Sequence, residues 1–246
     1  MDIGLLYPTR DCGEDDFAAL CRRLDPAPGL DFAYVEGDLD GLDAADAVRV
    51  LGTPEHLIAA ADTFPAVPDV VSWACSSCSF THGLDGARDQ ARALTGHLGV
   101  PASSTSLAYL AALDRLGIDR VTLASVYRPD LTGAFAAFLA EAGVTTVHAV
   151  SADAGSDRAL AGWDGRRITE LAVAADHPDA EAVLVPETAL HTTPLLAELD
   201  ERMGKPVLTA TAVTVWDALG GAPAQDGLGT LFNAGPGLRP PSSSAS

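Results

Sequence analysis

A run of thiol and hydroxyl side chains, Cys75-Ser76-Ser77-Cys78-Ser79, follows a strand-like apolar segment and precedes a helical pattern. Backbone N–H groups at the start of a helix favour anions and lower the pKa of a cysteine thiol. Three functional interpretations are open: a Cys-x-x-Cys redox pair, part of a zinc site, and a catalytic thiol beside an anion-binding turn. A small buried cysteine is the structural alternative, more so for Cys78 than for Cys75. We favour the catalytic thiol.

The redox and zinc interpretations each lack a supporting pattern. A zinc site needs two further ligands at suitable spacing, and Cys12, Cys21 and His82 form no second Cys-x-x-Cys or His-x₃-His motif. The Ser-Ser spacer and the absence of a thioredoxin-like order of elements weaken the redox pair. Because the N-terminus has no basic, signal-like stretch, we expect the four cysteines to be free thiols in a reducing compartment, and the protein to be cytoplasmic.

A second reactive group, Glu187, closes the apolar run VLVP and precedes Thr188. Partial burial would raise the pKa of this carboxyl toward neutrality, which suits a general acid or base. The alternative is an exposed glutamate at a helix start. His82 and His191 follow the two motifs at similar distances, and we expect them to orient loops rather than take part in the chemistry.

The elements that would position these groups are short apolar runs that alternate with longer helical patterns. The expected strands are Ile3–Tyr7, Leu30–Val35, Val67–Ala74, Arg120–Val126, Thr145–Val150 and Ala180–Pro186. The expected helices are Asp15–Leu24, Leu42–Thr63, Leu84–Leu98, Leu107–Leu116, Leu131–Ala142 (capped by Asp130), Gly165–Ala175, Thr193–Met203 and Val213–Leu219. This alternation predicts an α/β fold of βαβ units with parallel sheets covered on both faces.

An internal repeat organises the chain. DVVSWACSSCSF, a helix and HLGVPASSTSLAYLAAL correspond to EAVLVPETALHTT, a helix and RMGKPVLTATAVTVWDAL. We therefore predict two similar Rossmann-like halves related by a pseudo-twofold axis, with the active site in the cleft between them. The predicted divisions are 1–116 for the first half, 117–206 for the second, 207–232 for a segment that packs back on the first half, and 235–246 for a flexible tail.

Composition excludes several classes of function. The 246 residues include 34 Asp and Glu against 15 Lys and Arg, a formal net charge of −19, which disfavours nucleic acids and anionic membranes as partners. A chain with 48% hydrophobic residues buries a core without needing disulfides. No apolar run approaches the ~18–20 residues of a membrane span. Walker A, dinucleotide and Gly-x-Ser-x-Gly patterns with the required context are absent from the sequence.

Four phrases resemble the aspartate/glutamate racemase superfamily, in its branch of maleate cis–trans isomerases and arylmalonate decarboxylases. These phrases are WACSSCSFTHG, VLVPETALHTTPLLAELDERMGKPVLTATAVTVWDAL, VTLASVYRPDLTGAFAAFLAEAGV and IGLLYPTRD. The resemblance extends to about Phe232. It implies cofactor-independent chemistry. In the racemases of this superfamily two cysteines face each other across an acidic carbon of the substrate, and in the maleate isomerases the first thiol attacks the double bond while the second acts as an acid. In the decarboxylase only the second position carries a cysteine.

Carried over by motif, the resemblance assigns the first catalytic cysteine to Cys75. It implies that Ser76 and Ser77 hold a carboxylate, that Tyr127 is a hydrogen-bond donor, and that Thr188 belongs to the second Cys-Thr pair.

Three positions depart from the pattern of the maleate isomerases. Glu187 stands where the family has its second cysteine, Thr9-Arg10 replaces Ser-Asn, and an asparagine is missing near Trp163. A Cys/Glu pair still allows two-sided acid–base work, because a carboxyl with a raised pKa approaches a thiol in acidity. Arg10 offers a positive charge for a substrate carboxylate, with a solvated surface arginine as the alternative.

The sequence therefore favours a maleate isomerase-like enzyme that converts a small carboxylic or dicarboxylic acid through an enediolate-type intermediate. An arylmalonate-type decarboxylase, an amino-acid or hydantoin racemase, and a non-catalytic carboxylate-binding homologue remain open. The predicted catalytic pair is Cys75 and Glu187, and the predicted substrate-binding residues are Ser76, Ser77, Tyr127, Thr188, Thr9 and Arg10. We expect no metal or cofactor, no nucleic-acid or membrane partner, and a homodimer or higher homo-oligomer as an open possibility.

Overall fold

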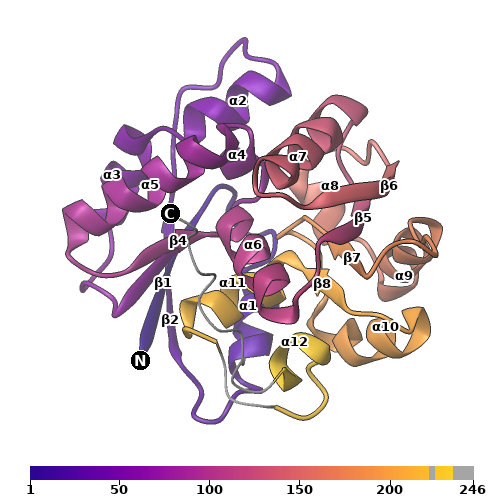
Figure 1. The fold of residues 1–246 in the computed structure, drawn as a ribbon. Coiled ribbons are helices and arrows are strands. Elements are labelled where there is room, and N and C mark those ends of the chain that lie inside the picture. The colour runs from indigo at the N-terminus through magenta and orange to yellow at the C-terminus, as the bar shows by residue number, and fades with distance from the viewer. Residues whose placement is uncertain (222–224, 235–246) are drawn as a thin grey trace, which may run out of the picture.

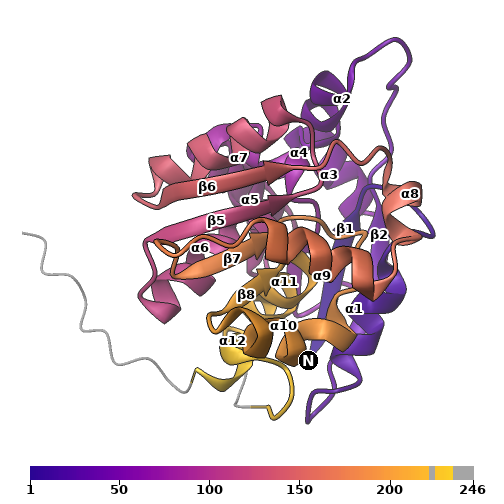
Figure 2. The same ribbon diagram turned by 90° about the vertical axis from the view of Figure 1, so that its right-hand side faces the viewer.

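Two four-stranded parallel sheets form the framework of the molecule (Figures 1 and 2). The computed structural model describes residues 1–221 and 225–234; the predicted tail 235–246 lies outside them. The first half contains β1 (Asp2–Tyr7), α1 (Glu14–Cys21), β2 (Gly29–Tyr34), α2 (Ala44–Leu51), α3 (Pro54–Ala61), β3 (Val70–Trp73), α4 (Ser77–Phe80), α5 (Gly83–Leu98), β4 (Ala102–Ser104) and α6 (Thr105–Leu116). Its strand order is β2-β1-β3-β4.

The second half repeats this arrangement. It contains β5 (Arg120–Ser125), α7 (Pro129–Glu141), β6 (Thr145–Ser151), α8 (Asp157–Ala161), α9 (Gly165–Ala174), β7 (Ala182–Val185), the 3₁₀ turn η1 (Thr193–Leu195), α10 (Leu196–Met203), β8 (Val207–Thr209) and α11 (Ala210–Ala218), followed by α12 (Thr230–Asn233). The strand order is β6-β5-β7-β8, and Figure 2 shows these strands in that order from top to bottom. The same order in both sheets confirms the predicted α/β fold of two similar halves.

The strands that precede the reactive groups are fully buried, whereas the edge strand β6 is not. Every residue of β3 and β7 is buried, and both are short apolar runs in the middle of a sheet. The edge strand β6 contains only half-buried and exposed residues. Parallel strands that are covered on both faces must be apolar on both sides. The continuous apolar runs that predict buried strands are therefore clearest at β3 and β7, the strands that Cys75 and Glu187 follow.

Two helix predictions are wrong in detail. The expected helix Leu42–Thr63 is two helices, because Thr53 adopts an extended conformation and Pro54 starts a new helix at its first position. The helix expected to start after an Asp130 cap begins instead at Pro129, with Arg128 in the capping position.

The two halves meet through α6 and α11, which follow β4 and β8 in equivalent positions. Thr105 Oγ1 on α6 lies 2.7 Å from Thr214 Oγ1 on α11. Tyr109 on α6 donates a hydrogen bond of 2.7 Å to the carbonyl oxygen of Val185 in β7. α11 also packs against α1 of the first half, and β8, which precedes α11, pairs with β7 in the second sheet.

Among the described residues, no helix combines the length and apolar character needed to cross a membrane. A continuous apolar core instead runs from β1 and α1 through α6 to β7 and α11.

Candidate active site

A cavity of about 80 Å³ lies at the carboxyl ends of β1, β3, β5 and β7, and both halves contribute to it. Its lining residues are Pro8, Thr9, Val48, Leu51, Cys75, Ser76, Ser77, Cys78, Tyr127, Asp157, Glu187 and Thr188. The carboxyl ends of parallel strands are the usual place for a ligand in α/β sheets. Seven of the eight residues predicted for the site are in this set; Arg10 is not.

The two reactive groups occupy equivalent positions in the two halves. Cys75 is the second residue after β3, and Glu187 is the second residue after β7. Both side chains are buried, at 5% and 6% exposure, and both line the cavity. The internal repeat therefore brings a sulfur and a carboxyl from opposite sheets to one small space.

On the first-half side, Cys75 forms a disulfide with Cys78, the second residue of α4. The expectation that all four cysteines are free thiols is wrong for this pair and right for Cys12 and Cys21, which are free and buried. The turn into α4 brings the Cα atoms of Cys75 and Cys78 to 5.5 Å, within the range of disulfides. From the sequence, a bonded Cys75–Cys78 pair was a weaker alternative than a free catalytic thiol.

Two serine hydroxyls lie on this side of the cavity, and one of them is next to the sulfur of Cys75. Ser77 Oγ lies 3.7 Å from Cys75 Sγ. The hydroxyl of Ser76 is buried and lies near the Tyr127 phenol without reaching hydrogen-bond geometry, so it makes no hydrogen bond in the described structure. A buried hydroxyl without a partner is costly in a protein interior, and this one lines the cavity, where a ligand oxygen would satisfy it.

On the second-half side, the pKa of Glu187 is raised to about 8, first by burial and then by the charge of Asp157. The backbone N–H of Ala189 donates a 2.8 Å hydrogen bond to Glu187 Oε1, which limits this rise. The expected shift toward neutrality is therefore present, and Glu187 is mostly protonated at pH 7. A neutral carboxyl can donate a proton.

Tyrosine hydroxyls fix the strand end that carries Glu187. Tyr127 donates a hydrogen bond to the carbonyl oxygen of Pro186, and Tyr7 donates one of 3.1 Å to that of Thr188. Burial raises the pKa of both tyrosines, and the carboxyl of Glu187 adds to the effect. Both phenols therefore stay protonated. Tyr127 lines the cavity as predicted, but its proton is directed at Pro186.

The loop after β1 places Thr9 in the cavity and Arg10 outside it. Thr9 Oγ1 donates a 2.6 Å hydrogen bond to Asp157 Oδ2. The Arg10 guanidinium lies 3.7 Å from the centre of the Tyr34 ring and 3.8 Å from Glu36, and its side chain is 59% exposed. The structure therefore favours the surface alternative for Arg10, because a cation–π contact on β2 holds it away from the cavity.

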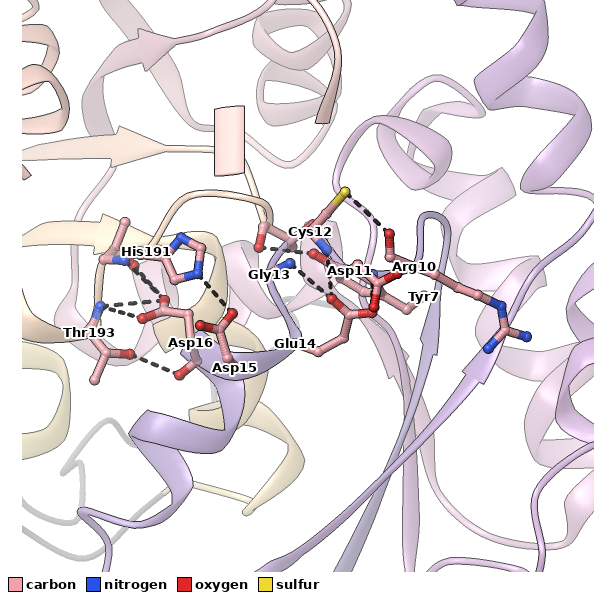
Figure 3. A network of polar contacts seen from close by, with 12 residues as sticks. Tyr7, Arg10, Asp11, Cys12, Gly13, Glu14, Asp15, Asp16, His191 and Thr193 are labelled. Atoms are coloured by element: carbon pink, nitrogen blue, oxygen red, sulfur yellow. Dashed lines mark hydrogen bonds and ion pairs between the residues drawn. The ribbon is translucent and has the colours of Figure 1, made fainter. Parts of the chain in front are cut away.

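Two carboxylates, half-buried Glu14 and buried Asp16, anchor the loops that follow β1 and β7 (Figure 3). Glu14 accepts hydrogen bonds from the backbone N–H groups of Asp11, Cys12 and Gly13 at 2.8–3.0 Å. Burial alone would raise the pKa of Glu14, but these bonds hold it below its usual value. Asp16 accepts bonds of 3.0 Å from the N–H groups of Thr192 and Thr193, which ties α1 to the loop after Glu187.

The histidines lie outside the cavity lining. His82 contacts the carbonyl oxygen of Arg49 at 3.1 Å, and His191 contacts Asp15 at 2.8 Å. These contacts tie α2 to the turn between α4 and α5, and the β7–η1 loop to α1, in keeping with a role in loop orientation. Within residues 1–221 and 225–234, no group of three or more His, Cys, Asp or Glu side chains could hold a metal ion.

Sequence reasoning missed Asp157, Val48, Leu51 and Pro8. Asp157 is the first residue of the short helix α8, where an acidic side chain is common for helix capping alone. Val48 and Leu51 belong to the apolar face of α2, which looks like ordinary core. A closer comparison of the repeats would have paired α2 with α8 and suggested that both helices reach the cleft.

A family model, a curated relative and a solved structure all relate this chain to arylmalonate decarboxylase. The family model described as arylmalonate decarboxylase matches residues 49–232. "Arylmalonate decarboxylase" of Bordetella bronchiseptica is 33% identical over 170 residues, which cover 67% of this chain and 71% of that protein. A solved mutant of arylmalonate decarboxylase in a sulfate-associated form is 29% identical, with a TM-score of 0.79 over 95% of this chain and all of that chain.

A likeness of fold extends to an isomerase. A variant of Nocardia farcinica maleate cis–trans isomerase with a covalently bound succinylcysteine intermediate has a TM-score of 0.79 at 20% identity, over 94% of this chain and 98% of that chain. These matches agree with the resemblance that the sequence motifs indicated.

Proposed function

Because the chain belongs to the arylmalonate decarboxylase family, we propose that it is a cofactor-independent enzyme acting next to a substrate carboxylate, with Cys75 and Glu187 as its acid–base pair. The observation that carries this proposal is the position of the two groups. They follow equivalent strands of the two halves and line one cavity of about 80 Å³. Isomerisation of a small carboxylic acid uses both groups and is the reaction we favour.

The cavity offers hydrogen bonds, rather than a cation, to the substrate carboxylate. None of its twelve described lining residues is Lys, Arg or His. The free hydroxyl of Ser76, together with Ser77 and Thr188, supplies donors for carboxylate oxygens. Preorganised donors of this kind stabilise the negative charge that develops in an enediolate, and this is commonly the largest catalytic contribution.

Proton transfer would then proceed from both sides. With its disulfide reduced, Cys75 as thiolate removes the proton of the carbon next to the carboxylate, and the C–H electron pair enters the enediolate. Protonated Glu187 returns a proton to the opposite face, which inverts the carbon.

On a cis double bond between two carboxylates, the same pair would act by addition. The Cys75 sulfur bonds to one alkene carbon while Glu187 protonates the other. After rotation about the new single bond, Glu187 takes a proton back and the C–S bond breaks, which leaves the trans isomer. The succinylcysteine intermediate of the Nocardia isomerase is an adduct of this type.

Decarboxylation is the second candidate, favoured by the 33% identity to arylmalonate decarboxylase and by the disulfide. While Cys75 is bonded to Cys78, Glu187 is the proton donor that remains of the pair. In this reaction the C–C bond to one carboxylate breaks, carbon dioxide leaves, and the electron pair forms an enediolate that Glu187 protonates on one face.

An NMR screen in deuterium oxide tests the proposal. The reduced protein is incubated with maleate, aryl- and alkylmalonates, aspartate, glutamate and hydantoins, with Cys75→Ser and Glu187→Gln as controls. Isomer formation or deuterium exchange that requires both residues supports isomerisation or racemisation. Carbon dioxide release that requires only Glu187 identifies the decarboxylase. An acid that binds without exchange, isomerisation or loss of carbon dioxide would mean a carboxylate-binding homologue and overturn the enzyme proposal.

A further inference from the structure

Asp157 is a carboxylate that the proposed reaction leaves unused although it lines the same cavity. It is the first residue of α8 in the second half. Its Oδ2 atom accepts the 2.6 Å hydrogen bond from Thr9 Oγ1, which comes from the β1–α1 loop of the first half. This bond joins the two halves beside the reactive groups, across 148 positions of sequence.

Among the groups that act on Glu187, Asp157 is unlike the rest. The titratable groups that interact with Glu187 are Asp157 from α8, Tyr127 after β5, Tyr7 from β1 and Tyr109 from α6. Tyr7 and Tyr109 are buried and Tyr127 is partly buried, and loss of solvent raises the pKa values of all three, so they remain neutral. Asp157 is therefore the anionic group of this set.

The charge of Asp157 has a direct consequence for Glu187. A carboxylate next to a second carboxyl disfavours ionisation of that second group. The pKa of Glu187, about 8, owes its rise first to burial and then to Asp157. A protonated Glu187 donates a proton to the substrate and does not repel the carboxylate that must enter the cavity.

We propose that Asp157 is a positioning residue: its carboxylate acts on the Glu187 carboxyl across the cavity that both line, and its hydrogen bond holds the Thr9 loop against α8. The role as a catalytic aid rests on the proposed function, whereas the effect on the protonation of Glu187 does not. Two variants separate the two parts of the proposal. Asp157→Asn removes the charge and keeps a side chain that can bind Thr9, while Thr9→Val removes the hydrogen bond and keeps the charge.

The first experiment needs no substrate. Infrared difference spectra across pH 5–10 follow the C=O stretch of the protonated Glu187 carboxyl in the reduced full-length protein, with Glu187→Gln identifying the band. Asp157→Asn should lower the midpoint by about one pH unit, because a like charge is lost. Thr9→Val should leave the midpoint near that of the parent protein. Asp157→Glu keeps the negative charge, so its midpoint should also lie close to that of the parent protein. An unchanged midpoint in Asp157→Asn would overturn the proposal, and so would a shift as large in Thr9→Val.

The second experiment uses whichever acid the screen shows to be turned over. The step that needs protonated Glu187 loses rate as the pH rises through the Glu187 pKa. In Asp157→Asn this fall in rate at alkaline pH, the alkaline limb, should move to lower pH by the same interval as the infrared midpoint. Thr9→Val should raise KM without moving the limb. A limb that stays in place while the infrared midpoint moves would remove Glu187 from the reaction and leave the electrostatic role of Asp157 intact. Failure of the proposed function and failure of this inference are thereby distinguishable.

Discussion

The two halves of the molecule have one topology and different chemistry at matching positions. After β3 the chain presents the sulfur of Cys75 and the hydroxyls of Ser76 and Ser77, and it turns directly into α4. After β7 it presents the carboxyl of Glu187, held by the N–H of Ala189, and reaches η1 only six residues later. The repeated fold therefore fixes where two groups meet, and the residue at each strand end decides what each group does.

The helices over the cleft differ as well. α2 in the first half contributes apolar Val48 and Leu51 to the cavity, whereas α8 in the second half contributes anionic Asp157. The wall of the cavity formed by α2 is therefore apolar, whereas Asp157 in the wall formed by α8 raises the pKa of Glu187. This asymmetry distinguishes a thiol side from a carboxyl side within a nearly symmetric framework.

Removing either reactive group should have the largest effect. We expect Glu187→Gln to lower kcat by ~10²–10⁴-fold, because the amide keeps the shape but cannot transfer a proton. Cys75→Ser should be at least as damaging to isomerisation, because a hydroxyl is a far weaker base and nucleophile at neutral pH. Steady-state kinetics and ligand binding should show lost turnover with nearly unchanged affinity in Glu187→Gln.

Glu187→Cys makes the two strand ends alike and tests the comparison from the other side. It should retain or redirect activity, because a second thiol replaces the carboxyl as proton donor. If Glu187→Gln keeps full rate on a substrate that Cys75→Ser no longer converts, Glu187 is structural and the enzyme depends on one thiol.

The disulfide predicts a redox requirement confined to the first half. A dithiol reductant exchanges with the Cys75–Cys78 disulfide and frees both thiols, so isomerisation should rise by roughly 10²-fold or more on reduction. Cys78→Ala removes the bonding partner, and its activity should no longer depend on the reductant. Equal isomerisation rates in oxidised and reduced protein would show that Cys75 does not act as a thiolate.

Glu187, the reactive group of the second half, should make the stability of the protein depend on pH. Because folding raises the pKa of Glu187 from its unfolded value of 4.5 to about 8, the stability associated with this group is present below pH 4.5 and is lost as the pH rises to 8. Glu187→Gln does not ionise, so above pH 8 it should be more stable than the parent protein by on the order of a few kcal/mol. Urea unfolding at pH 5 and pH 9 measures this, and an advantage that does not grow with pH would contradict the raised pKa.

The smallest effect is expected at Arg10. Its guanidinium stacks on Tyr34 outside the cavity lining, so Arg10→Ala should change kcat/KM by less than about twofold and stability by roughly 0.5–1 kcal/mol. A large rise in KM for the substrate would return Arg10 to the carboxylate-binding role that the sequence suggested.

The sequence predicted those features that periodicity and the repeat encode. All six expected strands are present, and the equivalence of Cys75 and Glu187 follows from aligning the two copies. The four-residue helix α4 and the five-residue helix α8 were missed, because helices so short carry no periodic signal.

The remaining features depend on tertiary contacts. Arg10 is drawn to Tyr34 across a strand pair, and Asp157 reaches the cleft because α8 packs next to the Thr9 loop. The pairing of Cys75 with Cys78 depends on the turn into α4, which brings their Cα atoms to 5.5 Å. None of these contacts is visible as spacing along one element.

The central claim is that Cys75 and Glu187 flank one reacting carbon from opposite halves, and a crystal structure of the reduced protein with a bound small carboxylate tests it most directly. Malonate, maleate and aspartate serve as probes, with Glu187→Gln used to trap a ligand that turns over. The account predicts that the carbon next to the carboxylate lies about 3–3.5 Å from Cys75 Sγ on one face and from the side chain of residue 187 on the other, with carboxylate oxygens on Ser76 and Ser77. A carboxylate bound elsewhere, or both side chains on the same face of the ligand, would contradict it.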